Sequence, residues 1–216
     1  MPSVTLRNNT SMASLSEHNL TNLIDTYSLH TFVETGYGNG GSFRFAKQHG
    51  FLQWFSCDVI KESAMKGRDA WPEDCVAHCN SIAMVSAIQQ ARMVLGIDMG
   101  NVLWWLDAHF PGVDTGLMGW EESARIYGVE SSCKEELETI LSGPCGGDVI
   151  IIDDAFLFRA GITNQAFNER VPEQYRHSLG SLEDVLDRFA ATHELQVNHE
   201  HTGSIALLPK KDLICC

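Results

Sequence analysis

The sequence predicts an α/β protein whose mostly parallel, seven-stranded sheet carries helices on both faces and ends in an antiparallel β-hairpin. Short apolar runs alternate with segments of helical spacing over most of the chain. Residues 149–152, Val-Ile-Ile-Ile, are the most hydrophobic of these runs and are expected at the centre of the sheet. The last two strand-like runs, 194–199 and 204–208, follow each other across a short turn, which indicates a hairpin rather than another helical crossover.

The first half of the chain alternates between strand-like and helix-like segments. A helix is expected from Ser14, with Glu17 completing a capping box. The apolar residues that follow share one face of that helix: Leu20, Leu23, Ile24 and Tyr27. The continuous apolar run 102–106 predicts a buried strand with Trp104 and Trp105 on opposite faces of the sheet. The other expected elements are strands at 30–35, 51–57 and 75–78 and helices at 42–49, 60–68 and 84–95, the last including Leu95.

Two long irregular segments interrupt the second half of the chain. Residues 108–131 and 155–179 are longer than ordinary connections and are expected to be lids or substrate loops. Helices are expected at 133–141 and from Ser181, where Asp184 completes a second capping box. The polar residues 1–13 are expected to be flexible, and residues 14–216 are expected to form a single domain.

The charge of the chain disfavours two classes of partner. Fifteen Lys and Arg against 28 Asp and Glu give a formal net charge of −13 at pH 7, whereas binding nucleic acid or anionic lipid requires clustered cations. The seven cysteines are an odd number, and the start of the chain lacks a signal-peptide pattern, which indicates reduced thiols and a cytoplasmic location. The expected partner is a small molecule, with no nucleic acid and no membrane, and homo-oligomer formation stays open.

A glycine-rich loop follows the first predicted strand. Gly36, Gly38 and Gly41 match the pattern GxGxxG, in which glycines let the backbone approach a nucleotide closely. Asp58 follows the second predicted strand, where its carboxylate can accept two hydrogen bonds from a ribose diol. Taken alone, these features leave open whether the nucleotide is a dinucleotide such as NAD or another adenosine-based cofactor.

Residues 33–40, Val-Glu-Thr-Gly-Tyr-Gly-Asn-Gly, resemble the first motif of class I S-adenosylmethionine-dependent methyltransferases, which have a Rossmann-like fold. The C-terminal hairpin is also typical of that fold. The resemblance implies that Glu34 helps to hold the ammonium group of the methionine moiety, a position at which a carboxylate would repel a pyrophosphate. It implies that Asp58 binds the ribose. The other residues that it places around S-adenosylmethionine are Gly36, Tyr37, Gly38, Gly40, Ser42, Asp107, and Asn80 and Ser81 beside the adenine.

Acidic residues also follow the fourth and fifth predicted strands. Asp107, Asp153 and Asp154 would converge there, and converging carboxylates favour a hard cation such as Mg²⁺. The arrangement resembles the metal-dependent O-methyltransferases of the macrocin and mycinamicin type, which implies that these three residues are the metal ligands. Strand-end carboxylates that cap helices and orient substrate without a metal are the alternative.

His109 stands where that family commonly carries a second Asp, which is proposed as a general base. An imidazole with an ordinary pKa of about 6.5 accepts a proton near neutrality, so His109 is a candidate base, and Asp107 is the other candidate catalytic residue. A fourth metal ligand and a structural loop residue are alternative interpretations of His109.

The leading hypothesis is therefore an S-adenosylmethionine-dependent methyltransferase that acts on an oxygen atom of a small molecule with the help of Mg²⁺. The alternatives are N-methylation, cyclisation or cleavage of S-adenosylmethionine, an NAD-dependent oxidoreductase, and a non-catalytic nucleoside-binding module. A broader resemblance, over about residues 20–209, to uncharacterised bacterial methyltransferase-like proteins names no substrate.

Overall fold

The computed structural model describes residues 14–113, 115–127, 132–158, 172–175, 182–199 and 203–211. The strands are β1 (Leu29–Thr35), β2 (Gln53–Asp58), β3 (Cys75–His78), β4 (Asn101–Leu106), β5 (Val149–Ile152), β6 (His193–Asn198) and β7 (Ser204–Pro209). The α-helices are α1 (Leu20–Tyr27), α2 (Gly41–Ala46), α3 (Lys61–Ala70), α4 (Ser81–Met93), α5 (Trp120–Tyr127), α6 (Cys133–Leu141) and α8 (Glu183–Phe189). Short 3-10 helices are η1 (Ser14–Glu17), η2 (Ala155–Leu157) and η3 (Glu173–Tyr175).

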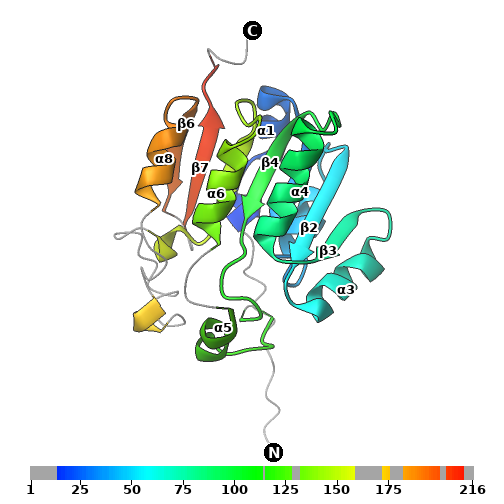
Figure 1. Ribbon diagram of the computed structural model, residues 1–216, viewed down its shortest axis with the longest axis vertical. Helices are drawn as coiled ribbons and strands as arrows, with labels where there is room; N and C mark the ends of the chain where they lie inside the picture. Colours follow the sequence, from blue (N-terminus) through cyan, green and yellow to red (C-terminus); the bar gives the residue numbers. More distant parts are fainter. Residues whose placement is uncertain are drawn as a thin grey trace, which may run out of the picture.

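These strands form one seven-stranded sheet in the order β3-β2-β1-β4-β5-β7-β6 (Figure 1). The first five strands are parallel, and β7 runs antiparallel to both β5 and β6. The predicted fold class, a mostly parallel sheet that ends in an antiparallel hairpin, is confirmed. The chain order reverses between β1 and β4, which in such sheets is where ligands bind.

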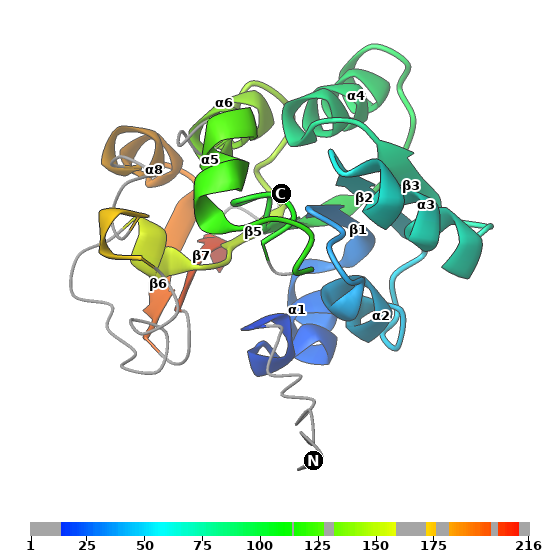
Figure 2. The ribbon, with the colours of Figure 1, turned by 90° about the horizontal axis from the view of Figure 1, so that it is seen from below.

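Helices cover both faces of the sheet and bury a separate apolar cluster on each. Figure 2 shows α4, α6 and α8 on one side and α1 and α2 on the other. Trp104 belongs to the cluster under α4, α6 and α8, while its neighbour Trp105 belongs to the cluster under α1 and α2, as predicted from strand alternation. Both indoles are completely buried. Within the described residues, no helix has the length and apolar character that crossing a membrane requires.

Two local predictions were wrong at helix ends. Ser14 and Glu17 lie in η1 and do not cap α1; the Asn19 side chain caps it instead, accepting a hydrogen bond of 3.1 Å from the amide of Asn22. Leu95 lies beyond α4, because Gly96 has φ +61° and the Ile97 amide bonds back to the carbonyl of Ala91, a left-handed helix ending.

The segment 108–131 contains a helix, α5, beyond the carboxyl edge of the sheet (Figure 1). Ser181 lies outside the described residues.

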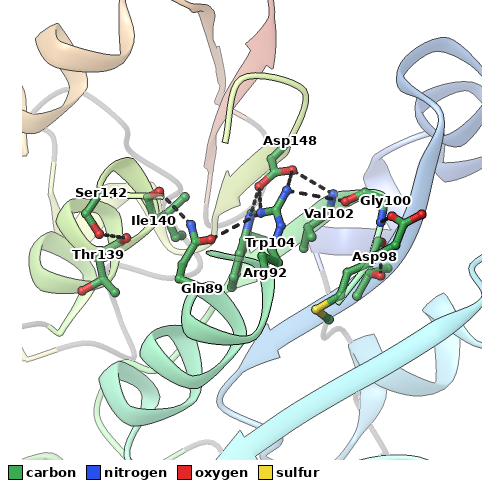
Figure 3. Close-up of polar contacts among 12 residues, drawn as sticks. Gln89, Arg92, Asp98, Gly100, Val102, Trp104, Thr139, Ile140, Ser142 and Asp148 are labelled. Atoms are coloured by element: carbon green, nitrogen blue, oxygen red, sulfur yellow. Dashed lines mark hydrogen bonds and ion pairs between the residues drawn. The ribbon is translucent and has the colours of Figure 1, made fainter. Parts of the chain in front are cut away.

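A buried ion pair joins the amino-terminal ends of β4 and β5 to α4 (Figure 3). The Asp148 carboxylate, completely buried, accepts hydrogen bonds of 2.7 and 3.0 Å from the Arg92 guanidinium. It also accepts bonds from the Trp104 indole at 2.9 Å and the Val102 amide at 3.0 Å. Its own carbonyl accepts a bond of 3.0 Å from Nε2 of His193 in β6. One residue thus holds four elements together at the edge of the sheet opposite the glycine loop.

We expect Asp148→Asn to lower the free energy of unfolding by about 3–5 kcal/mol, because it leaves the largely buried Arg92 guanidinium without a counter-charge. Asp184→Asn is the matched control. Asp184 lies 3.7 Å from Lys134 Nζ, both side chains are well exposed, and its loss should change stability by no more than about 0.5 kcal/mol. Chemical denaturation of the three proteins measures both values. Similar losses in the two variants would contradict a stabilising role for the buried pair.

Candidate functional site

The glycine loop leaves β1 at the carboxyl edge of the sheet, between β2 and β4. Gly36, Gly38 and Gly40 have φ values of +90°, +52° and +69°, which residues other than glycine rarely adopt. The amides of Gly36 and Tyr37 donate hydrogen bonds of 3.0 and 2.8 Å to the carbonyl of Cys57 at the end of β2. The loop is therefore folded back onto the neighbouring strand.

Asp58, the last residue of β2, holds the same loop from its other side. One carboxylate oxygen accepts a hydrogen bond of 2.8 Å from the amide of Gly38, and the other accepts one of 2.7 Å from the amide of Ile60. Burial raises the pKa of Asp58, and the two amide bonds oppose that rise. Because each carboxylate oxygen can accept two hydrogen bonds, capacity remains for the hydroxyl groups of a ligand.

Glu34 lies near the end of β1, two positions before Gly36, and its side chain is buried inside the protein. Its side chain is 1% exposed and accepts a hydrogen bond of 2.6 Å from Ser56 Oγ, together with one from the backbone amide of Phe43 in α2. Burial raises the pKa of this carboxyl group to about 8. In this position Glu34 links β1 to β2 and α2, and its contact with an ammonium group stays a prediction.

Tyr37, Gly40 and Ser42 form the inner wall of the loop. The Tyr37 ring is buried against the ring of Phe43, 5.9 Å between centroids, and a Cβ at Gly40 would overlap Tyr37. Ser42 is buried in the first turn of α2. The loop thus packs against the aromatic rings of Tyr37 and Phe43, which hold its backbone in place.

Asn80 and Ser81 follow β3 and begin α4. The exposed Asn80 caps the helix, with its side-chain oxygen accepting a bond of 2.8 Å from the amide of Ala83. Ser81 is buried, and its hydroxyl bonds to the carboxylate of Glu136 in α6. Both residues thus have a structural role. Asn80 also lies at the carboxyl edge of the sheet, where the glycine loop begins.

Asp107 follows β4 and lies directly beside the loop. Its amide donates hydrogen bonds to the carbonyl of Thr35 at 3.0 Å and to the Thr35 hydroxyl at 3.2 Å. A Cβ at Gly36 would overlap the carbonyl of Asp107, so only glycine allows the loop to lie this close to β4. The side chain of Asp107 is half-buried. The structure therefore brings together Gly36, Asp58 and Asp107 from three adjacent strands.

His109 is buried near the same strand end. Its ring lies edge-on to the ring of Phe158 at 5.1 Å and hydrogen-bonds to the backbone of Asp153. Burial lowers the pKa of His109 to about 4, so the ordinary value that the sequence argument assumed does not apply here. At neutral pH the imidazole is uncharged and a weak base.

The carboxylates predicted to bind Mg²⁺ do not gather into a metal site. Asp153 is buried, and its Oδ1 accepts a bond of 2.8 Å from the amide of Asp154, where the chain turns with φ +51°. Among the described residues, no group of three or more His, Cys, Asp or Glu side chains is arranged to hold a metal ion. As they lie, Asp107, Asp153 and Asp154 do not fit a resident ion.

Sequence reasoning assigned no role to Glu136, which the structure buries completely beneath these strand ends. The available signal was its place in α6. Cys133, Glu136, Leu137 and Ile140 are spaced so that they share the buried face of the helix. A charged residue at a core position of an amphipathic helix needs hydrogen-bonding partners, and it therefore indicates a polar site in the core.

No protein-family model matches the chain, and no curated protein matches its sequence. Solved structures share its fold. A putative caffeoyl-CoA O-methyltransferase from Staphylococcus aureus is 10% identical with a TM-score of 0.57, the match covering 91% of this chain and 84% of that one. The O-methyltransferase TomG from Streptomyces achromogenes, in complex with SAM, is 13% identical with a TM-score of 0.53, covering 94% and 83%. An O-methyltransferase from Bacillus cereus, in complex with SAH, is 15% identical with a TM-score of 0.52, covering 92% and 82%.

At these identities the likeness is one of fold. The chain has the Rossmann-like fold of these methyltransferases over more than nine-tenths of its length, as the resemblance of the glycine loop implied. The activity is a separate question, because one fold can support different reactions.

We expect Glu34→Gln to remove a pH dependence from stability. Between pH 4.5, the ordinary pKa, and about pH 8, the carboxyl group is ionised in the unfolded chain and protonated in the folded protein. Wild-type stability should therefore fall as pH rises through that window, by up to about 1.4 kcal/mol per pH unit, relative to a variant that cannot ionise. Denaturation of both proteins from pH 4 to pH 9 measures the difference. Parallel pH curves would contradict the buried, protonated state.

Proposed function

We propose that this protein is an S-adenosylmethionine-dependent methyltransferase that methylates a hydroxyl oxygen of a small molecule. The observation that carries the proposal is the glycine loop at the switch point, held between the carboxylate of Asp58 and the backbone of Asp107. Structures of the same fold in complex with SAM or SAH support the choice of cofactor over NAD.

The residues at the strand ends fit such a cofactor. Asp58 has free acceptor capacity for the two ribose hydroxyls, and a Cβ at Gly38 meets no atom within 4 Å, so the backbone there is open to a ligand. Asn80 and Ser81 would border the adenine, and Glu34 would help to hold the ammonium group of the methionine moiety. When bound, the cofactor supplies a methyl group already activated as a sulfonium.

Asp107 and His109 would face the acceptor from the end of β4. The half-buried carboxylate of Asp107 would orient the reacting hydroxyl and take its proton as the oxygen accepts the methyl group and S-adenosylhomocysteine leaves. His109, uncharged and buried, would be the second group on the acceptor side. Since the described carboxylates do not fit a resident ion, the proposed transfer is not routed through a metal, and it relies on positioning by the residues of the chain.

Calorimetry with S-adenosylmethionine, S-adenosylhomocysteine and NAD tests the cofactor. We expect the first two to bind and NAD not to bind. Methyl transfer from labelled S-adenosylmethionine to a panel of small phenols and sugars, with and without EDTA, then tests the reaction, with a methyl ether as the product. Binding of NAD alone would overturn the proposal, and methylthioadenosine formed without an acceptor would replace it with cleavage of the cofactor.

Gly38→Ala and Gly96→Ala form a matched pair. Their φ values are +52° and +61°, and a Cβ at either position meets no atom within 4 Å. Each substitution therefore carries a similar backbone strain, of the order of 1–2 kcal/mol. We expect a similar loss of stability in both variants but an increase of about tenfold or more in the Kd for S-adenosylmethionine only in Gly38→Ala. Equal affinities, measured by calorimetry, would contradict cofactor binding at the loop.

We expect Asp107→Asn to lower kcat about 100-fold with the acceptor found in the panel, because a carboxamide cannot take up the proton that the hydroxyl loses. The Kd for S-adenosylmethionine should change little, since the contacts of Asp107 with Thr35 and Gly36 are made by its backbone. Asp69→Asn, on the exposed surface of α3, is the control. Steady-state kinetics and calorimetry separate the two effects; unchanged kcat would remove Asp107 from the acceptor side.

A further inference from the structure

Glu136 lies in the first turns of α6 with no exposed surface, and three segments of the chain supply its partners. Ser132 Oγ donates a hydrogen bond of 2.8 Å to one carboxylate oxygen. Thr35 Oγ, at the end of β1, donates a longer bond of 3.5 Å to the other oxygen. The hydroxyl of Ser81, at the start of α4, bonds to the same carboxylate. The carboxylate therefore joins α6, β1 and α4 at one point.

The Thr35 hydroxyl extends this connection to β4. While donating to Glu136, it accepts the hydrogen bond of 3.2 Å from the amide of Asp107. The next residue, Gly36, begins the glycine loop and lies against the carbonyl of Asp107. Ser81 in turn directly follows Asn80. Glu136 thus connects the segments that follow three strands: Thr35 at the end of β1, Asp107 after β4 through the Thr35 hydroxyl, and Ser81 after β3.

Two completely buried carboxylates of this protein have different kinds of partner. Asp148 is paired with a guanidinium, whereas the hydrogen-bond partners of Glu136 given above are hydroxyl groups, which carry no charge. Burial raises the pKa of Glu136, which reflects the cost of holding its charged form there. A carboxylate held in this way adds little to stability, and a neutral side chain of similar shape should fold at least as well.

We propose that Glu136 is a positioning residue of the cofactor site: its carboxylate gathers the hydroxyls of Thr35 and Ser81 and so sets the spacing between the glycine loop, Asp107 and Asn80. The inference rests on the proposed function and assigns a residue to it that does not touch the cofactor. It explains why a costly buried charge lies beneath the switch point, since residues that serve a site often reduce stability.

Glu136→Gln tests the inference, with calorimetry for the affinity for S-adenosylmethionine and thermal unfolding for stability. We expect the Kd to rise about tenfold, because the amide replaces one of the two acceptor oxygens by a donor. The unfolding temperature should stay the same or rise. Glu135→Gln is the matched control, since the neighbouring side chain is exposed, and it should leave both quantities unchanged.

Two further comparisons separate positioning from a general effect on the fold. Thr35→Val removes the hydroxyl that links Glu136 to Asp107 and should also raise the Kd, whereas Thr35→Ser keeps the hydroxyl and should restore the affinity. Asp148→Asn lowers stability at the opposite edge of the sheet and should leave the affinity unchanged at temperatures where the protein is folded.

The outcomes distinguish the two proposals. If the unchanged protein binds S-adenosylmethionine and Glu136→Gln binds it equally well, the inference is overturned and the proposed function stands. The inference is also overturned if Asp148→Asn loses as much affinity as Glu136→Gln, because the loss would then follow stability alone. If the unchanged protein does not bind S-adenosylmethionine, both proposals are overturned together.

Discussion

The parallel pairing of β1 with β4 is the constraint on which the candidate site depends. Thr35 is in register with Leu106, so both strands end at the same level of the sheet. From this pair the chain order runs outward in both directions, through β2 on one side and β5 on the other. The segments that leave β1 and β4 diverge here, and the glycine loop and Asp107 meet between them. The hydrogen bonds from the Asp107 amide to Thr35 hold the two ends together.

The buried carboxylates of this protein differ in what satisfies them, and the difference explains what each contributes. Asp148 has a guanidinium and serves stability at the edge away from the site. Asp58 accepts hydrogen bonds from two backbone amides and keeps acceptor capacity for the hydroxyl groups of a ligand. Glu136 accepts hydrogen bonds from hydroxyl groups, and Glu34 accepts one from a hydroxyl group and one from a backbone amide. Burial raises the pKa of both carboxyl groups. Several of the acidic residues of this chain are therefore buried, where they hydrogen-bond to residues at the ends of strands.

The fold and the chemistry are supported by different observations. The sheet order and the solved structures of methyltransferases agree on the fold, although the sequence identities are 10–15%. The chemistry depends on few side chains. Asp107 is half-buried at the end of β4, whereas Asp58, Glu34 and His109 are all buried. Burial alone therefore does not separate the residues proposed to touch a ligand from those that support them.

The sequence by itself determined the order of strands and helices, because hydrophobic periodicity reflects which face of each element is buried, and it placed Glu34, the glycine loop, Asp58 and Asp107 at strand ends. Helix ends were less predictable: Asn19 and Gly96 act through local hydrogen bonds that compete with the apolar pattern. Only the tertiary structure decided the rest. The pKa of His109 depends on burial by segments distant in sequence, and Glu136 gains its partners from three separate segments. That Asp107, Asp153 and Asp154 are not arranged to hold a metal ion is likewise visible only in the structure. Contacts between segments distant in sequence arise from packing, which no local pattern of residues encodes.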